Sequence, residues 1–580
     1  MKGSLVAPRS AVLVLAFIVS AVPTVVRAAP VYRGGVVATA HPDASEAALA
    51  LLRKGGNAVD AAIGAAFALA VVGPYHSGLG GGGFALAFDA RSGQTDALDF
   101  REVAPAEASR DMFLRGGDPV PELSRDGALS VAVPGAAAGY LALLAKRGRL
   151  GRAAVLAPAI RLARQGFVVT PKYQAMARGR LEVLRRDPET ARLFLRPNAQ
   201  GLPDVPPLGT RIVQPELAGS LAALARQGAS AFYSGKMARA MVQSVAVAGG
   251  LLSLEDLTRY RVRWRAPLRG QYRGHAILTM PPPSAGGLAV VQALIMFETA
   301  FPQRPAFHDP EAMHVLVESL RRIFADRARW LGDPAFSEVP LERLASRAYL
   351  GELLGGIDRE HATPSASLLE LSSPAPREVQ PEKKNTTHIS VVDREGNAVS
   401  MTTTLNYGFG SGLVARGTGI LLNDEMDDFA AKPFAPNVYG LVTGEANAVA
   451  AGKIPLSSMA PTLVFQEEDP SRVMLALGSP GGSTIPTTVI QVIQNVIDLG
   501  LDPGRAVAMG RVHHQYLPDV LQVDRWGLEA ATRRALQAKG HVIKEVDPWG
   551  DGEAVMVDPK TGLRTAGSDP RNEGTALGER

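Results

Sequence analysis

A run of four residues, Asn385-Thr386-Thr387-His388, carries side chains that could act in acyl transfer. A threonine hydroxyl is a poor nucleophile unless a base lies beside it. If the chain is cut between Asn385 and Thr386, Thr386 gains a free α-amine that can serve as the base for its own hydroxyl. An ordinary threonine-rich strand is the alternative, because β-branched residues favour strands. The run therefore raises the hypothesis of a self-cleaving enzyme with an N-terminal nucleophile and leaves a structural role open.

A second hydroxyl is predicted to lie near this candidate nucleophile. A two-residue turn at 395–396 would join two β-rich runs, 388–392 and 398–404, as a hairpin. That turn pairs Thr404 with Thr387. Thr404 would then be offset by one residue from Thr386. At that offset its hydroxyl is close enough to form a hydrogen bond near Thr386.

A glycine-rich turn, Gly478-Ser479-Pro480-Gly481-Gly482, lies between a strand candidate at 473–477 and a helix candidate at 483–498. Backbone N–H groups at such a turn, together with the helix dipole, favour an anion. The oxyanion of an acyl-transfer intermediate is such an anion, so the turn is a candidate oxyanion hole. A simple strand-to-helix turn is the alternative.

Other common site patterns are excluded. The run 78–83 matches G-x-G-x-x-G, but a helix precedes it and a hairpin follows it, whereas dinucleotide binding needs a strand before and a helix after. The sequence has no G-K-[ST] phosphate loop, no H-E-x-x-H zinc motif and no G-x-S-x-G elbow. His513 and His514 are adjacent and so point apart, which makes a weak metal pair. The chain has no cysteine, which removes disulfides, cysteine nucleophiles and thiolate metal sites.

The elements that must position these residues are helices packed on a sheet. Two N-terminal helices are expected, the first opened by a capping box at Asp43 and Glu46 and ending at Arg53, the second capped by Asn57 and buried on nearly every face. Residues 136–370 are expected to be mainly helical, residues 372–384 to form a polar loop, and the chain after about residue 571 to be disordered. Further strands are expected at 84–88, 96–100, 462–465 and 473–477.

Composition and the N-terminus indicate an exported protein. With 580 residues, of which 46% are hydrophobic, the chain can bury a large core. The net charge of +5 is a weak field, and no Lys/Arg block is long enough for a nucleic-acid site. An apolar run at 11–26, preceded by Lys2 and Arg9 and followed by Ala28, is typical of a secretory signal peptide cleaved after Ala28. An uncleaved anchor is the alternative. We therefore expect a periplasmic or secreted protein.

Nine runs, taken in order, resemble the γ-glutamyltransferases, also called γ-glutamyltranspeptidases or glutathione hydrolases, of the N-terminal-nucleophile hydrolase superfamily. The resemblance extends from about residue 36 to residue 571. The runs are Lys54-Gly-Gly-Asn-Ala-Val-Asp60, Gly80-Gly-Gly-Gly-Phe84, Asp99-Phe-Arg-Glu-Val-Ala-Pro105, Asn385 through Val399, Thr404-Leu-Asn, Leu422-Asn-Asp-Glu-Met-Asp-Asp-Phe429, Pro436-Asn-Val-Tyr-Gly440, Pro455-Leu-Ser-Ser-Met459 and Gly478-Ser-Pro-Gly-Gly482.

The resemblance implies an α+β fold, a four-layer αββα sandwich, made as one precursor. Residues 1–28 would be the signal peptide, 29–385 a large subunit and 386–580 a small catalytic subunit that stays associated with it. It also implies an acyl-enzyme on Thr386, made from glutathione or another γ-glutamyl amide and transferred to water, an amino acid or a dipeptide. No metal or organic cofactor, no nucleic acid and no stable membrane insertion are expected.

The resemblance also assigns roles to single residues. Thr404 would position the Thr386 hydroxyl, and Gly481 and Gly482 would supply the oxyanion N–H donors. Arg101, helped by Ser457 and Ser458, would bind the α-carboxylate of the γ-glutamyl group, as suits a bidentate guanidinium. Asn406, Glu425 and Asp428 would bind its α-ammonium, and Tyr439 would be the gating aromatic of a lid loop at 433–447. Position 425 departs from several bacterial relatives, which carry Gln there.

Two other functions stay open. A β-lactam or glutaryl acylase would share the fold, although such relatives often lack the lid and part of the set that binds the α-amino and α-carboxylate groups. A noncatalytic periplasmic binding protein would keep the pocket without the chemistry. The presence of Thr386, Thr404 and the Gly481–Gly482 pair argues against that second alternative.

Overall fold

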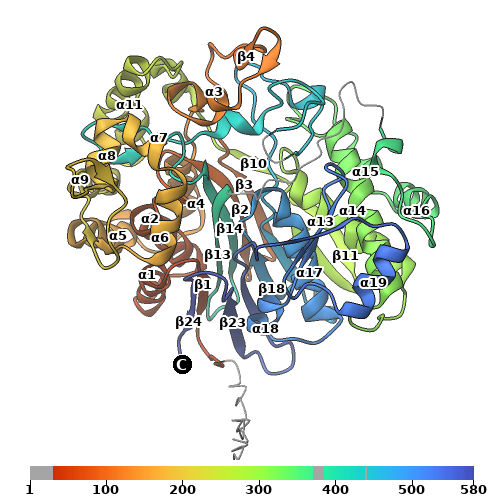
Figure 1. Cartoon of the computed structure of the whole chain (residues 1–580). Coiled ribbons are helices and arrows are strands. Elements are labelled where there is room, and N and C mark those ends of the chain that lie inside the picture. Colours follow the sequence, from red (N-terminus) through yellow and green to blue (C-terminus); the bar gives the residue numbers. More distant parts are fainter. Residues whose placement is uncertain (1–29, 370–383, 438–439) are drawn as a thin grey trace, which may run out of the picture.

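The computed structural model describes residues 30–369, 384–437 and 440–580, and within these ranges two antiparallel sheets lie face to face (Figure 1). The first sheet has the order β10-β3-β2-β14-β13-β1-β24 and the second the order β11-β12-β17-β18-β22-β23. The strands of the first sheet are β10 (Arg263–Arg265), β3 (Gln94–Asp99), β2 (Gly82–Asp89), β14 (Ala398–Tyr407), β13 (Lys384–Val392), β1 (Val36–Thr39) and β24 (Thr575–Gly578). Those of the second are β11 (Leu268–Tyr272), β12 (His275–Thr279), β17 (Thr462–Phe465), β18 (Val473–Gly478), β22 (Glu553–Val557) and β23 (Arg564–Ser568).

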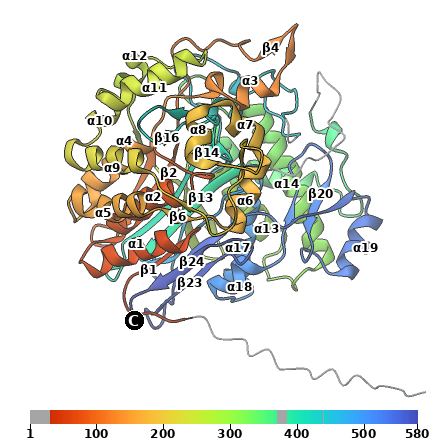
Figure 2. The same ribbon diagram turned by 60° about the vertical axis from the view of Figure 1, so that its left-hand side comes forward.

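Helices cover the outer face of each sheet (Figures 1 and 2). The first sheet is covered by α1 (Pro42–Arg53), α2 (Ala58–Val72) and α4 (Ala136–Arg147), and α5 (Arg152–Gln165) packs on α2. The second sheet is covered by α13 (Ala285–Ala300), α17 (Ile485–Ile497) and α18 (Pro503–Ala508), and α14 (Pro310–Trp330) packs on α13. Along β13, Ile389 and Val391 pack into the core beneath α1 and α2. Val392 packs into a second core, which is formed by residues of both sheets and of α13, α14 and α17. This arrangement of layers confirms the predicted αββα sandwich.

Smaller elements complete the chain around this sandwich. The remaining helices are α3 (Pro121–Arg125), α6 (Pro171–Gly179), α7 (Leu181–Arg186), α8 (Pro188–Phe194), α9 (Pro215–Gln227), α10 (Ser230–Tyr233), α11 (Lys236–Val247), α12 (Leu254–Arg259), α15 (Leu341–Leu344), α16 (Arg347–Gly355) and α19 (Ala530–Ala538). Short strand pairs are β4 (Leu114–Arg115) with β5 (Asp118–Pro119), β6 (Phe167–Val168) with β9 (Arg211–Ile212), β7 (Arg196–Pro197) with β8 (Pro203–Asp204), and β15 (Val414–Ala415) with β16 (Ile420–Leu421), and a three-stranded sheet contains β19 (Val512–His513), β20 (Leu521–Asp524) and β21 (Ile543–Val546). In the part of the chain that the structure describes, no helix is both long and apolar enough to cross a membrane.

One of the two predicted helix caps is wrong. Asn57 caps α2 as predicted, and a capping box with Asp60 completes that end. The cap of α1, however, is His41, whose Nδ1 accepts a hydrogen bond from the backbone N of Asp43 at 3.2 Å. Pro42 follows His41 at the first helical position, where proline is well tolerated. The helix therefore begins before the Asp43–Glu46 pair that was expected to cap it.

The register of the β13–β14 hairpin differs by one residue from the prediction. Residues 393–397 form a longer loop, in which Asp393 N donates to Asn397 O at 2.9 Å and Asp393 Oδ1 accepts from the backbone N of Glu395 and of Asn397. Gly396 takes a φ of +90° in this loop. As a result Thr386 lies directly opposite Thr404, and Thr387 is paired with Thr403.

The C-terminal segment is ordered, which contradicts the prediction of disorder after about residue 571. Residues Thr575–Gly578 form β24, which pairs antiparallel with β1 at the edge of the first sheet (Figure 2). The side chain of Glu579 accepts a hydrogen bond from Gly35 N at 2.8 Å. β1 is thus held between β13 and β24.

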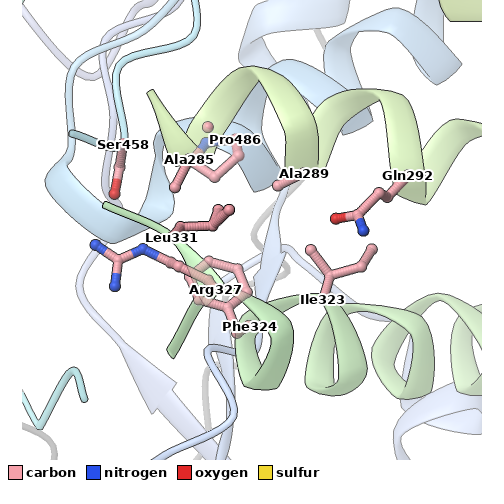
Figure 3. Close-up of a pocket in the computed structure, with 10 residues that line it drawn as sticks. Ala285, Ala289, Gln292, Ile323, Phe324, Arg327, Leu331, Ser458 and Pro486 are labelled. Carbon is pink, nitrogen blue, oxygen red and sulfur yellow. The ribbon is translucent and has the colours of Figure 1, made fainter. Parts of the chain in front are cut away.

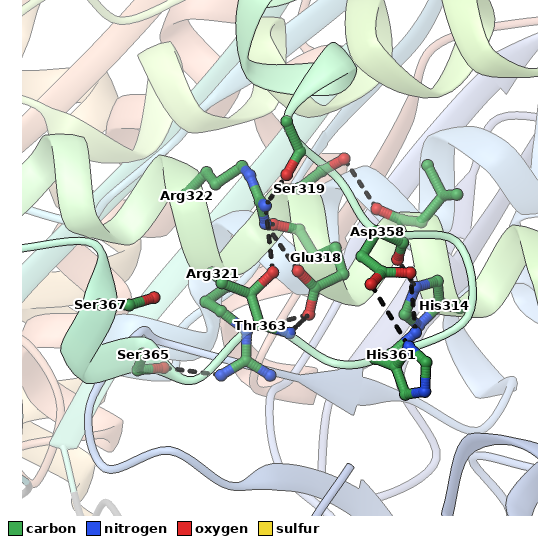
Figure 4. Close-up of polar contacts among 12 residues, drawn as sticks. His314, Glu318, Ser319, Arg321, Arg322, Asp358, His361, Thr363, Ser365 and Ser367 are labelled. Carbon is green, nitrogen blue, oxygen red and sulfur yellow. Dashed lines mark hydrogen bonds and ion pairs between the residues drawn. The ribbon is translucent and has the colours of Figure 1, made fainter. Parts of the chain in front are cut away.

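A buried charged cluster fixes the segment that precedes residues 370–383 (Figure 4). Glu318 of α14 pairs with Arg321 and Arg322, and it also accepts a hydrogen bond from Thr363 N at 3.2 Å. Arg321 reaches onward to Ser365 Oγ at 2.6 Å. The chain is therefore anchored on α14 shortly before the polar loop that was predicted at 372–384. Most of that loop, like the predicted signal peptide at 1–28, lies outside the described residues.

Candidate functional site

The two threonines of the hairpin lie side by side at the end of β13. The Oγ1 atoms of Thr386 and Thr404 are 3.1 Å apart, and both side chains are buried. The pairing shifts between Lys384 and Thr386, so the Asn385–Thr386 bond lies at an irregularity of the β13–β14 ladder. Such irregularities are frequent beside active sites because they redirect a side chain. β13 runs through this bond, so the structure is that of the uncut chain.

Thr404 also organises the backbone of the next residues. Its Oγ1 accepts a hydrogen bond from Asn406 N at 2.8 Å, and Asn406 has a positive φ of 78°. The Asn406 side chain donates to Asp424 O at 3.0 Å, which connects β14 to the segment that carries Glu425. A positive φ at a residue other than glycine is uncommon and here turns the chain at the edge of the pocket.

The glycine-rich turn has the backbone that the sequence suggested. Gly481 and Gly482 have φ values of +131° and +56°, which favour glycine. A Cβ atom on Gly481 would lie only 2.4 Å from Thr484 Oγ1. The turn then continues through a 3₁₀ turn at Gly482–Thr484 into α17. Gly482 lines the same pocket as Thr386.

Arg101 is a fully buried cation that follows β3. Its guanidinium binds the carboxylates of both Glu425 and Asp428, and one of its nitrogens lies 3.7 Å from Glu102 Oε2. Burial alone would lower the pKa of Arg101, but the carboxylates of Glu425 and Asp428 outweigh it and raise this pKa. Burial also raises the pKa of Glu102, and the nearby Glu425 raises it further. The residues predicted to bind a carboxylate and an ammonium therefore bind one another here.

One small pocket brings most of the predicted site residues together. Gly481 adjoins this lining through Gly482, and Tyr439 lies outside the described residues. The pocket is lined by Arg101, Arg327, Thr386, Thr404, Asn406, Glu425, Asp428, Leu456, Ser457, Ser458, Met459, Gly482 and Ile485.

Sequence reasoning missed four of these lining residues, of which Arg327 is the charged one. Arg327 belongs to α14, a helix that was predicted only as part of a broad helical region. It also lines a small neighbouring pocket between α13 and α14, where its guanidinium lies on the same side as Ser458 (Figure 3). A run of charged residues on the buried face of one helix, from Glu318 to Arg327, was the signal that could have found it. The other three are Leu456, Met459 and Ile485.

This arrangement is suited to acyl transfer from a zwitterionic donor. A pair of hydroxyls faces a turn with glycine N–H groups, and a buried cation with two carboxylates lies in the same pocket. The hydroxyls can supply a nucleophile, the turn can bind an oxyanion, and the charged residues can hold a group that carries both charges.

The αββα sandwich with a threonine pair across the adjacent central strands β13 and β14 defines an N-terminal-nucleophile hydrolase. Within that class, the model of the gamma-glutamyltranspeptidase family matches residues 44–579, and the chain belongs to this family.

Individual relatives agree with this assignment. The glutathione hydrolase proenzyme of Escherichia coli K12 is 42% identical over 93% of this chain and 90% of its own length. The crystal structure of cephalosporin acylase from Bacillus halodurans has a TM-score of 0.81 at 27% identity, with full coverage of both chains. The γ-glutamyltranspeptidase of Helicobacter pylori has a TM-score of 0.54 at 36% identity, over 58% of this chain and 96% of that chain.

Proposed function

We propose that this chain is the precursor of a γ-glutamyltransferase and glutathione hydrolase. One observation carries the proposal: the Thr386–Thr404 hydroxyl pair shares a pocket with Arg101, Glu425 and Asp428. The donor would be glutathione or another γ-glutamyl amide, and the acceptor water, an amino acid or a dipeptide. Membership of the family and 42% identity to a glutathione hydrolase proenzyme support it.

Maturation comes first: hydrolysis of the Asn385–Thr386 peptide bond consumes one water, leaves a carboxylate on Asn385 and gives Thr386 a free α-amine. That amine takes the proton from Thr386 Oγ1 as the oxygen attacks the γ-carbonyl carbon of the donor. The tetrahedral oxyanion is stabilised by N–H groups of the turn at Gly481 and Gly482. Collapse breaks the C–N bond, and the leaving amine takes the proton back. Water or an acceptor amine then attacks the ester and releases Thr386.

Recognition of the γ-glutamyl group would exchange one set of ion pairs for another. Arg101 would bind the α-carboxylate together with Ser457 and Ser458, and Asp428 would bind the α-ammonium together with Asn406 and Glu425. Removing one partner of a buried ion pair is costly, because the other charge is left without compensation. A donor that carries both charges satisfies both sides at once, which favours zwitterionic γ-glutamyl groups over neutral acyl groups.

Two subunits are proposed for the mature protein, residues 29–385 and 386–580. The strand order supports their lasting association, because β1 of the first lies between β13 and β24 of the second. β2 pairs with β14, and β12 pairs with β17, across the same division. Export to the periplasm or the medium is proposed from the signal-peptide pattern at 1–28.

A β-lactam or glutaryl acylase is the second candidate, favoured by the similarity to the cephalosporin acylase structure. The two candidates differ in whether the enzyme recognises the α-ammonium group of the donor. Comparing amine release from a γ-glutamyl anilide and from the matching glutaryl anilide isolates that group, since the two donors differ only by it. Strong preference for the γ-glutamyl donor is expected, and equal or reversed preference would favour the acylase.

The nucleophile is tested separately by Thr386→Ala. Intact mass should show one uncut chain, and no anilide should be hydrolysed. Cleavage at the same bond in this variant would contradict the assignment of Thr386.

A further inference from the structure

The inner face of the β13–β14 hairpin carries polar side chains where the interior of a sandwich is normally apolar. Three cross-strand pairs follow one another along this face, because side chains alternate between the two faces of a sheet. The pairs are Thr386 with Thr404, His388 with Thr402, and Ser390 with Ser400. All six residues are buried, and the hydroxyls of Ser390 and Ser400 hydrogen-bond to the second sheet.

His388 is the centre of this row, and its ring contacts its own strand, β13, and the neighbouring strand β14. Its Nδ1 lies 2.8 Å from Thr402 Oγ1, and its Nε2 lies 3.1 Å from Ser390 Oγ and 3.4 Å from Ser400 Oγ. Burial lowers the pKa of His388 to about 3, so the ring is neutral at neutral pH.

The surrounding hydroxyls determine which ring nitrogen carries the proton. Ser390 Oγ donates to Glu553 O and Ser400 Oγ donates to Leu477 O, each at 2.9 Å. A serine hydroxyl has a single proton, so both can only accept from His388. Nε2 is therefore the protonated nitrogen, and Nδ1 accepts a hydrogen bond from Thr402.

The ring of His388 also presses against the strand that leads to the glycine-rich turn. A Cβ atom added to Gly478 would lie 2.2 Å from Cε1 and 2.4 Å from Nδ1 of the ring. Gly478 is the last residue of β18 and the first of the turn that ends at Gly482. One neutral side chain thus connects the strand of the nucleophile to the strand of the candidate oxyanion hole.

We propose that His388 is a positioning residue that sets the spacing between the Thr386 hydroxyl and the N–H groups at Gly481 and Gly482. The proposal rests on the proposed function, in which both groups act on the same carbonyl. His388 is outside the lining of the pocket, so it acts through its neighbours, and no proton is transferred through it. Misplacement of reacting groups by about 1 Å can lower a rate roughly a hundredfold.

The first test compares His388→Gln with His388→Ala in steady-state kinetics with the γ-glutamyl anilide. Glutamine keeps an N–H donor near the Nε2 position, whereas alanine removes both the hydrogen bonds and the packing against Gly478. We expect kcat to fall roughly tenfold in the glutamine variant and roughly a hundredfold in the alanine variant. KM should change less than about threefold, because the effect is on the reacting groups and not on donor binding.

A double-mutant cycle tests the contact between His388 and Gly478. Gly478→Ala alone should displace the ring and lower kcat. In the His388→Ala background the added methyl enters the space that the ring leaves, so the second substitution should cost much less there. Losses that simply multiply would mean that the two residues act independently, which would overturn the proposed link.

His541→Asn is the matched control, because it removes another buried imidazole, one that contacts His314 and none of the site residues. Its kcat should stay within about twofold of the parent protein.

Wild-type kcat in a folded, self-cleaved His388→Ala protein would overturn the proposal. If His388→Ala does not fold, His388→Gln and Gly478→Ala give the same comparison. A parent protein that does not hydrolyse the γ-glutamyl anilide would contradict the proposed function alone, and the rate of self-cleavage in the variants would then test His388.

Discussion

At the scale of single residues, Arg101 and Asp428 have separable roles in the proposed donor site. Asp428→Asn should lower kcat/KM for the γ-glutamyl anilide by roughly tenfold to a hundredfold, because a hydrogen bond to a charged group is worth about 1.5–3 kcal/mol. The glutaryl anilide lacks the ammonium group and should be nearly unaffected. Arg101→Lys should weaken both donors alike, because both carry the carboxylate and lysine lacks the planar fork of arginine. Equal losses for both donors in Asp428→Asn would contradict a role in reading the ammonium.

Most residues of the proposed site could be predicted from the sequence because they lie in short runs. Thr386, Gly482 and Asp428 were all predicted and all line one pocket. The ion pairs of Arg101 with Glu425 and Asp428 could not be predicted in that way, since more than three hundred residues separate the partners. Arg327 was missed for a related reason: it reaches the pocket only through the packing of α14.

At the scale of elements, the errors of sequence reasoning occurred where a side chain or a distant strand decides the local structure. Asp393 binds backbone N–H groups within its own loop and so lengthens the link between β13 and β14. That change moved the register by one residue and brought Thr404 directly opposite Thr386. β24 is short and has only one large apolar residue, and it forms because the edge of β1, more than five hundred residues earlier, offers unpaired backbone groups.

Removal of β24 should therefore weaken the sheet that carries the proposed nucleophile, Thr386. A protein that ends at residue 572 loses the four pairings between β24 and β1 and also the Gly35–Glu579 hydrogen bond. We expect a loss of at least about 2 kcal/mol in the free energy of unfolding, since each hydrogen bond contributes about 0.5–1.5 kcal/mol. Urea unfolding of the deletion variant measures this loss. Glu579→Gln, which keeps β24, is the control and should lose much less, and an unchanged midpoint in the deletion variant would mean that β24 contributes nothing.

At the scale of the whole molecule, buried titratable groups should limit stability on both sides of neutral pH. On the acid side, burial lowers the pKa of His76, His388 and His541 to about 3 and that of His513 and His514 to about 4. The unfolded chain binds these protons near pH 6.5, well before the folded chain does. As the pH falls from 6.5 to the folded-state pKa of a histidine, that histidine therefore lowers the free energy of unfolding by about 1.4 kcal/mol per pH unit.

Buried carboxyls act in the opposite direction on the alkaline side. Burial raises the pKa of Asp551 to about 8, and burial also raises the pKa of Glu553 well above its ordinary value. Each of these carboxyls holds its proton more tightly in the folded chain than in the unfolded chain. The resulting stabilisation is complete below the pKa of the unfolded chain and is lost as the pH rises to the pKa of the folded chain. Between about pH 4.5 and 6.5 the five histidines make stability rise with pH and the two carboxyls oppose this, so the histidines prevail and the melting temperature should rise towards pH 6.5. The rise should be steeper below about pH 4.5, where the two carboxyls are protonated in both states, and the melting temperature should fall with increasing pH between pH 6.5 and 8.

Two substitutions separate the two limbs of this profile, measured as melting temperature from pH 3 to pH 9. Asp551→Asn removes the carboxyl that ionises near pH 8, so its melting temperature should fall less between pH 6.5 and 8 than that of the parent protein. His541→Asn removes one histidine that must be charged on unfolding, so the acid limb should become shallower while the alkaline limb stays unchanged. A parallel shift of the whole profile in both variants would mean that the substitutions alter packing alone. The pH dependence would then have to come from other groups whose pKa differs between the folded and the unfolded chain, such as the buried carboxyls of Glu102 and Asp424, whose pKa burial raises.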